Sequence, residues 1–328
     1  MISIRRRQLM KLGLGLGLAG GAILPAAHGH SEYPAKPLRL IHGFGAGGNA
    51  DVVSRLMARQ LAQSLGQPVV VEIKSGAGGR IASDSVAKAQ PDGYTLVMLT
   101  GAHTVSAAMT RELPYDPVKD FSFLSTVSSF PFVIAVRADH PAKTLADLLA
   151  LAASEPGRVT FTSVGVGSTQ HMTGEILAAA ANVKLLHVPY RGGGAPVEAV
   201  IAGDVDILSD TLTVAGPQIK AGRLRALAVT SGQAWSSVPD MPTVAQTLPG
   251  FEVRSWLGLA APSGLPDAIV DRLNAAIVQA LQADEVRLSL ATLGSEPAPG
   301  NAHQMRSLVE NEIVRWRGVV QTAKLSPV

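Results

Sequence analysis

The feature that most restricts the fold is an alternation of short strand-like runs and longer segments of helical period, which begins near residue 36. The runs rich in β-branched residues or Leu have the length of strands; they are 38–42, 68–73, 94–99, 132–136, 159–163, 185–190, 205–209 and 224–230. Between them, and in two closing segments at 266–282 and 301–325, apolar residues recur every three to four positions, as in helices. This order predicts an α/β fold with mostly parallel sheets and helices on both faces.

The roughly 300 residues that follow the predicted signal would make an oversized single sheet, so we expect two lobes. The chain has two halves with the same order of elements and no evident linker. We expect residues 30–131 and 251–328 to form one lobe and residues 132–250 the other. The closing helices lack strands of their own and would return to cover the first sheet. The chain would then cross between the lobes near 132–136 and near 249–256, as in a hinged protein with a cleft.

Residues 1–29 have the three parts of an export signal: a basic stretch, an apolar run of about 13 residues and a segment of small residues. The apolar run is shorter than the roughly 20 residues that a membrane anchor needs. Arg6 and Arg7 resemble the twin-arginine consensus, and an ordinary signal rich in arginine is the alternative. We expect a cleaved, exported protein and leave the pathway open.

Composition excludes several classes of function. The chain has no Cys, which rules out disulfides, thiolate metal sites and a cysteine nucleophile. Four of the 28 basic residues lie in the first 11 positions, and aromatic residues make up only 4% of the chain, so a nucleic-acid surface is not expected. The eight His are scattered and no metal-binding motif occurs, so no metal is expected.

Glycine-rich turns follow four of the predicted strands, at 43–51, 74–80, 164–171 and 191–196. In parallel α/β sheets such turns lie at the carboxyl edge, where ligands bind. Their helix N-terminal amides favour anions. Four turns of this kind predict a site that holds a carboxylate or phosphate mainly through backbone N–H groups, although glycine in any one turn is also explained by tight turns and close helix packing.

The first turn also fits the dinucleotide fingerprint. Gly43, Gly45 and Gly48 satisfy GxGxxG between a strand and a helix, and Glu72 ends the next strand. An exported NAD(P)-dependent oxidoreductase is therefore the alternative function. The spacing to Glu72 is long for this motif, and no catalytic acid/base pair is evident beside a substrate arginine.

Other polar residues suggest weaker alternatives. Ser163 or Ser168 with His171 and Asp210 could form a hydrolase triad, but no GxSxG motif is present. Asp51 is expected in the first turn of its helix, facing the positive end of the dipole. Asp210, at the carboxyl end of a strand, is expected to face the cleft.

Seven segments carry a resemblance to a known family: 34–79, 87–96, 113–121, 167–175, 187–196, 219–231 and 238–246. In this order they resemble the tripartite tricarboxylate transporter substrate-binding receptors, the TctC-like or Bug family. The resemblance implies a periplasmic solute receptor with two α/β lobes of the type II-like binding-protein fold. Such a receptor closes on a small organic anion and delivers it to a membrane permease. It also implies that the protein is not an enzyme and has no catalytic residue. We expect no cofactor and a monomer, although the residues do not decide the oligomeric state.

The resemblance places the ligand site between the lobes. In the first loop it implies Phe44, Ala46, Gly47, Gly48, Asn49 and Asp51, where this chain has glycine and alanine at positions that are usually proline. In the second lobe it implies Ser163, Gly165, Gly167, Ser168, Thr169 and His171. The remaining residues that the resemblance implies around the ligand are Gly78, Gly79, Gly101, His103 and Asp210. The residue after Asp210 is often Asn in the family and is Thr211 in this chain.

We expect this site to capture a ligand without chemistry. One carboxylate would lie on the amides of the first loop, and the far end of the ligand would meet Ser168, Thr169 and Asp210. A sugar is disfavoured, since sugar receptors supply aromatic faces and this chain has few aromatic residues. Which carboxylate binds, and whether the protein serves transport or sensing, is not readable from the residues.

Overall fold

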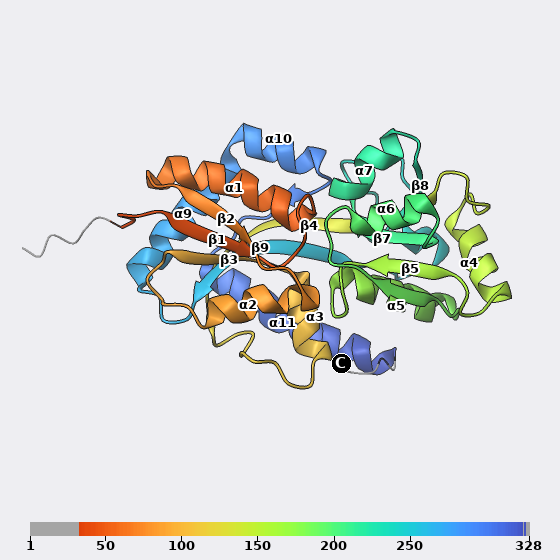
Figure 1. Cartoon of the computed structure of the whole chain (residues 1–328), viewed down its shortest axis with the longest axis horizontal. Helices are drawn as coiled ribbons and strands as arrows, with labels where there is room; N and C mark the ends of the chain where they lie inside the picture. The colour runs from red at the N-terminus through yellow and green to blue at the C-terminus, as the bar shows by residue number, and fades with distance from the viewer. Residues whose placement is uncertain (1–32, 324, 326–328) are drawn as a thin grey trace, which may run out of the picture. The chain divides into compact units, whose positions relative to one another are not determined.

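The computed structural model describes residues 33–323 and 325, so the predicted export signal lies outside the described residues. Strands and helices alternate along this part of the chain (Figure 1). In chain order they are β1 (Leu38–His42), α1 (Asn49–Leu65), β2 (Val69–Ile73), the 3-10 helix η1 (Ala77–Gly79), α2 (Arg80–Ala87), β3 (Thr95–Thr100), α3 (Gly101–Met109), β4 (Phe121–Arg137), α4 (Leu145–Ser154), β5 (Thr160–Ser163), α5 (Thr169–Ala181), β6 (Leu186–Pro189), α6 (Ala195–Ala202), β7 (Ile207–Thr211), α7 (Leu212–Lys220), β8 (Leu224–Val229), α8 (Val244–Thr247), β9 (Arg254–Pro262), α9 (Asp267–Gln282), α10 (Asp284–Thr292), β10 (Glu296–Pro297) and α11 (Ala302–Thr322). Within the described range, none of the helices combines the length and apolar character that crossing a membrane would need.

The strands pair in the order β2-β1-β3-β9-β4-β7-β5-β6, and β8 and β10 also pair with β4. The pairs of β1 with β2 and β3, and of β5 with β6 and β7, are parallel. Every pair that includes β4 or β9 is antiparallel. The predicted α/β fold with helices on both faces is confirmed. The expectation of mostly parallel sheets is wrong: the sheet is mixed, because the two long strands β4 and β9 run antiparallel to their neighbours through its middle (Figure 1).

Strand β4 joins two groups of strands. Its residues 121–131 pair with β9, and its residues 132–137 pair with β7 and β8. We call β1–β3, β9, β10 and the first part of β4 lobe 1, and β5–β8 with the second part of β4 lobe 2. The chain changes partners near the predicted crossing at 132–136, and the exact lobe boundaries stay a prediction.

A buried threonine ties the two crossings together. The Thr230 hydroxyl accepts the N–H of Phe132 (2.8 Å) and donates to the carbonyl of Val253 (2.6 Å). The backbone of Thr230 also bonds to both residues. Both passages between the lobes are therefore held at one point.

The prediction that the closing helices lack strands is wrong. Strand β9 precedes α9, and the short β10 precedes α11. Most other predicted strands agree with the structure to within one or two residues, but β4 is 17 residues long, where the sequence predicts five. The segment 254–262 carries apolar residues on both faces and pairs with β3 and β4, far away in sequence, so no local alternation marks it as a strand.

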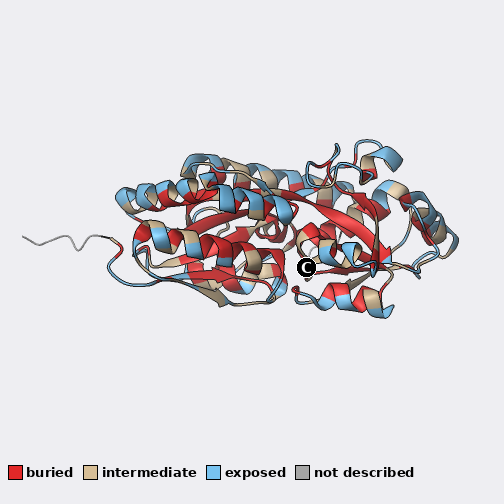
Figure 2. Cartoon of the chain, turned by 90° about the horizontal axis from the view of Figure 1, so that it is seen from above, coloured by how far each residue is buried: buried red, intermediate tan, exposed pale blue. Residues whose placement is uncertain are grey.

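The helices pack their apolar stripes onto both faces of the sheet. On α1, Val53, Met57 and Leu61 are fully buried and recur at intervals of four residues. The helix ends at Gly66, whose left-handed conformation (φ 69°) suits glycine. Figure 2 shows buried strands between helices whose outer faces are exposed. This packing fixes the strand ends, and with them the loops that form the site.

Candidate functional site

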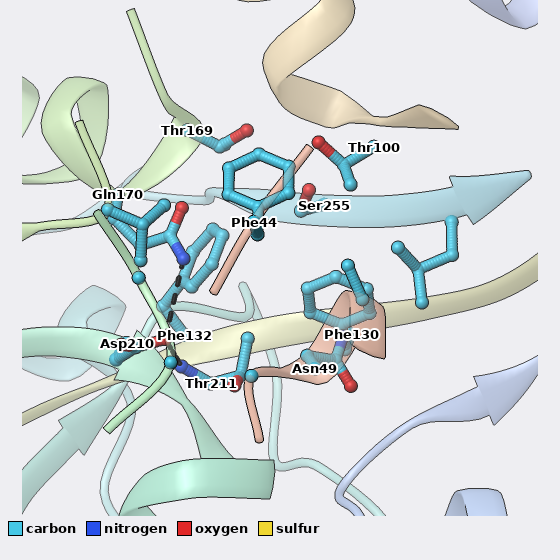
Figure 3. Close-up of a pocket in the computed structure, with 16 residues that line it drawn as sticks. Phe44, Asn49, Thr100, Phe130, Phe132, Thr169, Gln170, Asp210, Thr211 and Ser255 are labelled. Atoms are coloured by element: carbon cyan, nitrogen blue, oxygen red, sulfur yellow. Dashed lines mark hydrogen bonds between the residues drawn. The ribbon is translucent and has the colours of Figure 1, made fainter. Parts of the chain in front are cut away.

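A cavity lies where loops of both lobes meet over β4 and β9 (Figure 3). Its lining residues come from the loops after β1, β3, β5, β6 and β7, and from the two long strands. They are Phe44, Gly48, Asn49, Ala50, Thr100, Phe130, Phe132, Val164, Thr169, Gln170, Gly192, Gly193, Asp210, Thr211, Ser255 and Leu257.

Four helix N-termini open onto this cavity. The lining includes the N-cap residues Gly48 of α1, Thr100 of α3 and Thr211 of α7, and the first residue of α5, Thr169. Gly48 and Thr211 provide no side-chain cap, so the first amides of α1 and α7 lack that partner. The helix dipoles favour negative charge at this place. Among the described residues that line the cavity none is Lys, Arg or His, so the positive potential comes from the backbone.

Three buried polar atoms in the lining have no hydrogen-bond partner: Asn49 Nδ2, Thr169 Oγ1 and Thr211 Oγ1. Each of these residues is at least 90% buried. Buried polar atoms in proteins are almost always bonded, so a group of unpaired atoms around one cavity indicates a polar ligand.

Asn49 also contacts the other lobe. Its Oδ1 accepts a hydrogen bond from the hydroxyl of Thr213 on α7 (2.7 Å). This bond to the other lobe fixes the orientation of the Asn49 side-chain amide. Its Nδ2 remains without a hydrogen-bond partner. The orientation of a cavity donor therefore depends on the two lobes being together.

Asp210 is the one ionisable side chain among the described residues of the lining, and only 3% of it is exposed. Its Oδ1 accepts the N–H of Thr211 (2.7 Å) and the side-chain amide of Gln170 (3.4 Å). Burial raises the pKa of Asp210 to about 6. The two hydrogen bonds and the nearby Thr211 hydroxyl act in the opposite direction but do not outweigh the effect of burial. Asp210 faces the cavity as the sequence predicts.

A buried network shapes the first loop. Asp51 accepts hydrogen bonds from the N–H of Gly47 (2.9 Å) and from Arg55 Nε (2.9 Å), and lies 3.1 Å from His42 Nε2. Burial acts to raise the pKa of Asp51, but the bonds from Arg55, Gly47 and His42 outweigh it and hold the pKa low. Asp51 lies in the first turn of α1 as predicted, and its carboxylate holds the loop rather than lining the cavity.

Loops of the two lobes touch directly beside the cavity. The N–H of Gly45 donates to the carbonyl of Arg191 (3.2 Å), and Gly45 pairs with Gly192 as a parallel bridge. A Cβ on Gly45 would lie 2.9 Å from the carbonyl oxygen of Gly192. In a dinucleotide site the second glycine of the motif admits the pyrophosphate; here the backbone of Gly192 takes that space.

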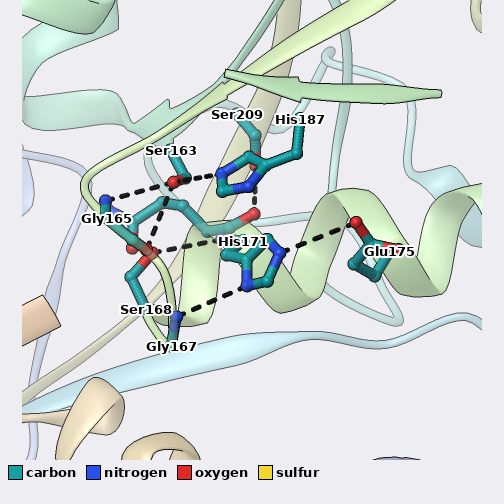
Figure 4. A network of polar contacts seen from close by, with 9 residues as sticks. Ser163, Gly165, Gly167, Ser168, His171, Glu175, His187 and Ser209 are labelled. Carbon is teal, nitrogen blue, oxygen red and sulfur yellow. Dashed lines mark hydrogen bonds and ion pairs between the residues drawn. The ribbon is translucent and has the colours of Figure 1, made fainter. Parts of the chain in front are cut away.

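Next to the glycine-rich turn at 164–171 lies a histidine pair (Figure 4). The rings of His171 and His187 stack with centroids 4.0 Å apart, and His187 Nε2 is 2.6 Å from Ser163 Oγ. Burial lowers the pKa of His171 to about 4, and burial together with His171 lowers that of His187 to about 3. Ser168 caps α5 by accepting the N–H of His171 (3.2 Å). Ser163, Ser168 and His171, which the sequence offered for a hydrolase triad, thus stabilise the turn at 164–171 instead. Ser163 is also fully buried.

The structure brings some of the predicted site residues to the cavity and places others around it. Those in the lining are Phe44, Gly48, Asn49, Thr169 and Asp210. A smaller neighbouring cavity, behind Phe44, is lined by Gly78, Gly79 and His103 among others. The remaining predicted residues, outside both linings, are Ala46, Gly47, Asp51, Gly101, Ser163, Gly165, Gly167, Ser168 and His171.

Sequence reasoning missed the floor of the cavity. Phe130 and Phe132 come from β4, and Ser255 and Leu257 come from β9. No motif marks them, because the residues look like ordinary strand residues. Gln170, next to Thr169, was signalled only by its place at a helix start. In the described part of the chain, no three His, Asp or Glu side chains are grouped so that they could hold a metal ion.

Comparison with known proteins identifies the family of this chain. The model described as "Tripartite tricarboxylate transporter family receptor" matches residues 53–325. A UPF0065 protein from the tcbD-tcbE intergenic region of Pseudomonas sp. (strain P51) is 36% identical over 99% of this chain and 97% of its own length. Protein BugT of Bordetella pertussis is 33% identical over 96% of this chain and 97% of its own.

Solved structures agree with this match. R. palustris Rpa4515 with adipate has a TM-score of 0.88 and 33% identity, covering 90% of this chain and 100% of its own. MatC (Rpa3494) from Rhodopseudomonas palustris with bound malate has a TM-score of 0.83 and 34% identity, covering 88% and 100%. The predicted two-lobed binding-protein fold is confirmed by these neighbours, and the oxidoreductase alternative finds no support in them.

Proposed function

Since the chain belongs to the tripartite tricarboxylate transporter family of receptors, we propose that it captures a small carboxylate in the cavity between its lobes and passes it to a membrane permease. The observation that carries the proposal is the convergence of four helix N-termini on a cavity whose described lining has no cationic side chain. A site of this kind holds an anion by backbone amides. The names of two similar structures, which report adipate and malate, support the ligand class.

The carboxylate would accept hydrogen bonds from the open amides of α1 and from Asn49 Nδ2, while Thr169 and Thr211 provide hydroxyls from lobe 2. The rings of Phe44, Phe130 and Phe132 would contact its apolar part. No pair of groups is arranged for acid/base or nucleophilic chemistry in the described lining, and this supports a receptor that releases its ligand unchanged.

Closure would bring the two halves of this site together. The Gly45–Arg191 and Asn49–Thr213 hydrogen bonds join the lobes beside the cavity. A ligand that touches both lobes stabilises the arrangement in which these bonds form, so binding shifts the protein toward the closed state.

The proposed function also includes a cellular location and a membrane partner. We propose that residues 1–29 direct export and are cleaved, and that the mature monomer works in the periplasm with the permease subunits of a tripartite tricarboxylate transporter. The family match supports a periplasmic receptor.

Two isosteric substitutions test the site. Thr169→Val removes a hydroxyl that has no partner, so it should leave the stability of the ligand-free protein unchanged or higher and weaken carboxylate binding by about tenfold. Thr160→Val is the matched control: its hydroxyl bonds to Asp206 at 2.7 Å, away from the cavity, so it should lower stability and leave affinity intact. Calorimetry and urea unfolding measure both quantities. Equal affinity of Thr169→Val and the unaltered protein for every carboxylate would contradict the proposed site.

A further inference from the structure

Asp210 places a negatively charged side chain in a cavity whose helix N-termini otherwise favour anionic ligands. The carboxylate lies at the end of β7, where α7 begins. Its side chain is buried, and both hydrogen bonds that reach it go to the same oxygen, Oδ1. Apart from the adjacent Thr211 hydroxyl, no further side chain bonds to this carboxylate, so Oδ2 can accept a hydrogen bond from whatever occupies the cavity.

No cationic side chain in the described lining pairs with Asp210, although the N-terminus of α7 favours its negative charge. Within the described lining its bonded partners are a backbone N–H and the Gln170 amide, both uncharged, and no Lys, Arg or His is present. Placing a second carboxylate against Asp210 would bring two like charges together in a poorly solvated place, which is costly. A hydroxyl or an ammonium group at the same point would donate to Oδ2 instead.

The two ends of the cavity therefore differ in chemistry. In Figure 3, Asp210 and Gln170 lie on one side of Phe44 and Phe132, and Thr100 and Ser255 lie on the other. Thr100 and Ser255 are neutral hydroxyls, and together with the N-terminus of α3 they suit a carboxylate. The side of Asp210 suits a donor.

We propose that Asp210 selects carboxylates that carry a hydrogen-bond donor, a hydroxyl or an ammonium group, over plain dicarboxylates of the same length. This inference rests on the proposed function and narrows its substrate class. A site built to bond a donor rejects an analogue that lacks it, because its own acceptor is then buried without a partner.

Calorimetric titration with two matched series tests the selection: succinate, malate and aspartate, and glutarate, 2-hydroxyglutarate and glutamate. The measurements are made at pH 8, where Asp210 is ionised. In at least one series we expect the protein to bind a donor-bearing member at least tenfold more tightly than the plain diacid. The affinities for malate and aspartate then show whether the site prefers a hydroxyl or an ammonium group.

Asp210→Asn supplies the decisive comparison. It keeps an oxygen for the Thr211 N–H and removes the charge, so the preference should vanish and the plain diacid should bind more tightly than to the unaltered protein. This gain cannot come from misfolding. Asp204→Asn, an exposed change on the same segment, is the control and should keep the preference.

The outcomes separate this inference from the proposed function. If plain diacids bind as tightly as their hydroxy and amino analogues, or if Asp210→Asn keeps the preference, the selection by Asp210 is wrong while the receptor function stands. If no carboxylate of either series or of a wider panel binds the unaltered protein, the proposed function itself is wrong, and the selection with it.

Discussion

Replacing Gly45 by alanine tests whether the loop contact between the lobes is part of the ligand-bound state. A Cβ at this position would lie 2.9 Å from the carbonyl oxygen of Gly192 and 3.1 Å from the nitrogen of Gly193. Both neighbours are backbone atoms, which cannot turn aside as a side chain can. The φ of Gly45 is outside the left-handed region, so lobe 1 itself accepts alanine without strain.

Gly45→Ala should raise the free energy of the closed state, in which the two loops touch. The Gly45–Arg191 hydrogen bond would be lost, which costs about 0.5–1.5 kcal/mol, and relief of the overlap adds to it. A total of about 1.4 kcal/mol or more corresponds to a tenfold or greater loss of ligand affinity. The ligand-free protein can relieve the overlap by opening, so its urea unfolding midpoint should change little.

Gly194→Ala is the matched control in the facing loop. Gly194 has φ −80°, and a Cβ there would meet nothing within 4 Å. Calorimetry gives the affinities, and small-angle scattering with and without ligand gives the degree of closure. If Gly45→Ala binds ligand and closes like Gly194→Ala, the contact between the two loops plays no part in capture.

Two further predictions concern stability. Thr230→Val should lower the free energy of unfolding by about 3 kcal/mol, because the Phe132 N–H and the Val253 carbonyl lose their shared buried partner; a loss below about 0.5 kcal/mol in urea unfolding would show that the crossing does not depend on this hydroxyl. Stability should also fall as the pH drops from about 6.5 toward 4, since His171 and His187 have folded pKa values of about 4 and about 3 and the unfolded chain takes up protons that the folded chain excludes. His187→Gln should lose less stability over this range than the unaltered protein, and an equal loss would contradict the assignment.

The local order of strands and helices was predictable, whereas the middle of the sheet was not. Runs such as 38–42 and 224–230 carry their own strand signal and agree with β1 and β8. Strand β9 and the full length of β4 depend on pairings between residues more than 120 positions apart, such as Phe121 with Pro262. Strand formation of this kind is decided by tertiary context, which a single sequence does not display.

The site shows the same division. Glycine-rich turns marked the loops, and Asn49, Thr169 and Asp210 follow from them. Phe130 and Phe132 give no local sign of lining a cavity, because a buried phenylalanine has the same neighbours in sequence in either role. The low aromatic content of the chain also gave no warning that three of its seven Phe gather at one place.

The glycines of the first loop show why a motif needs its surroundings. Gly43, Gly45 and Gly48 satisfy a dinucleotide pattern, yet Gly43 and Gly45 pack closely against the backbones of Gly79 and Gly192. The same freedom from a side chain that admits a pyrophosphate also admits another loop. Only the fold distinguishes the two uses.

Capture of a carboxylate without chemical change is the function that we propose for this protein. Its most direct test is calorimetric titration of residues 30–328 with a panel of small carboxylates, NAD and NADP, followed by mass spectrometry of the recovered ligand. We predict saturable binding of one group of carboxylates, no binding of either nucleotide, and recovery of the ligand intact. Binding of a nucleotide alone, or conversion of the ligand to a product, would contradict the account.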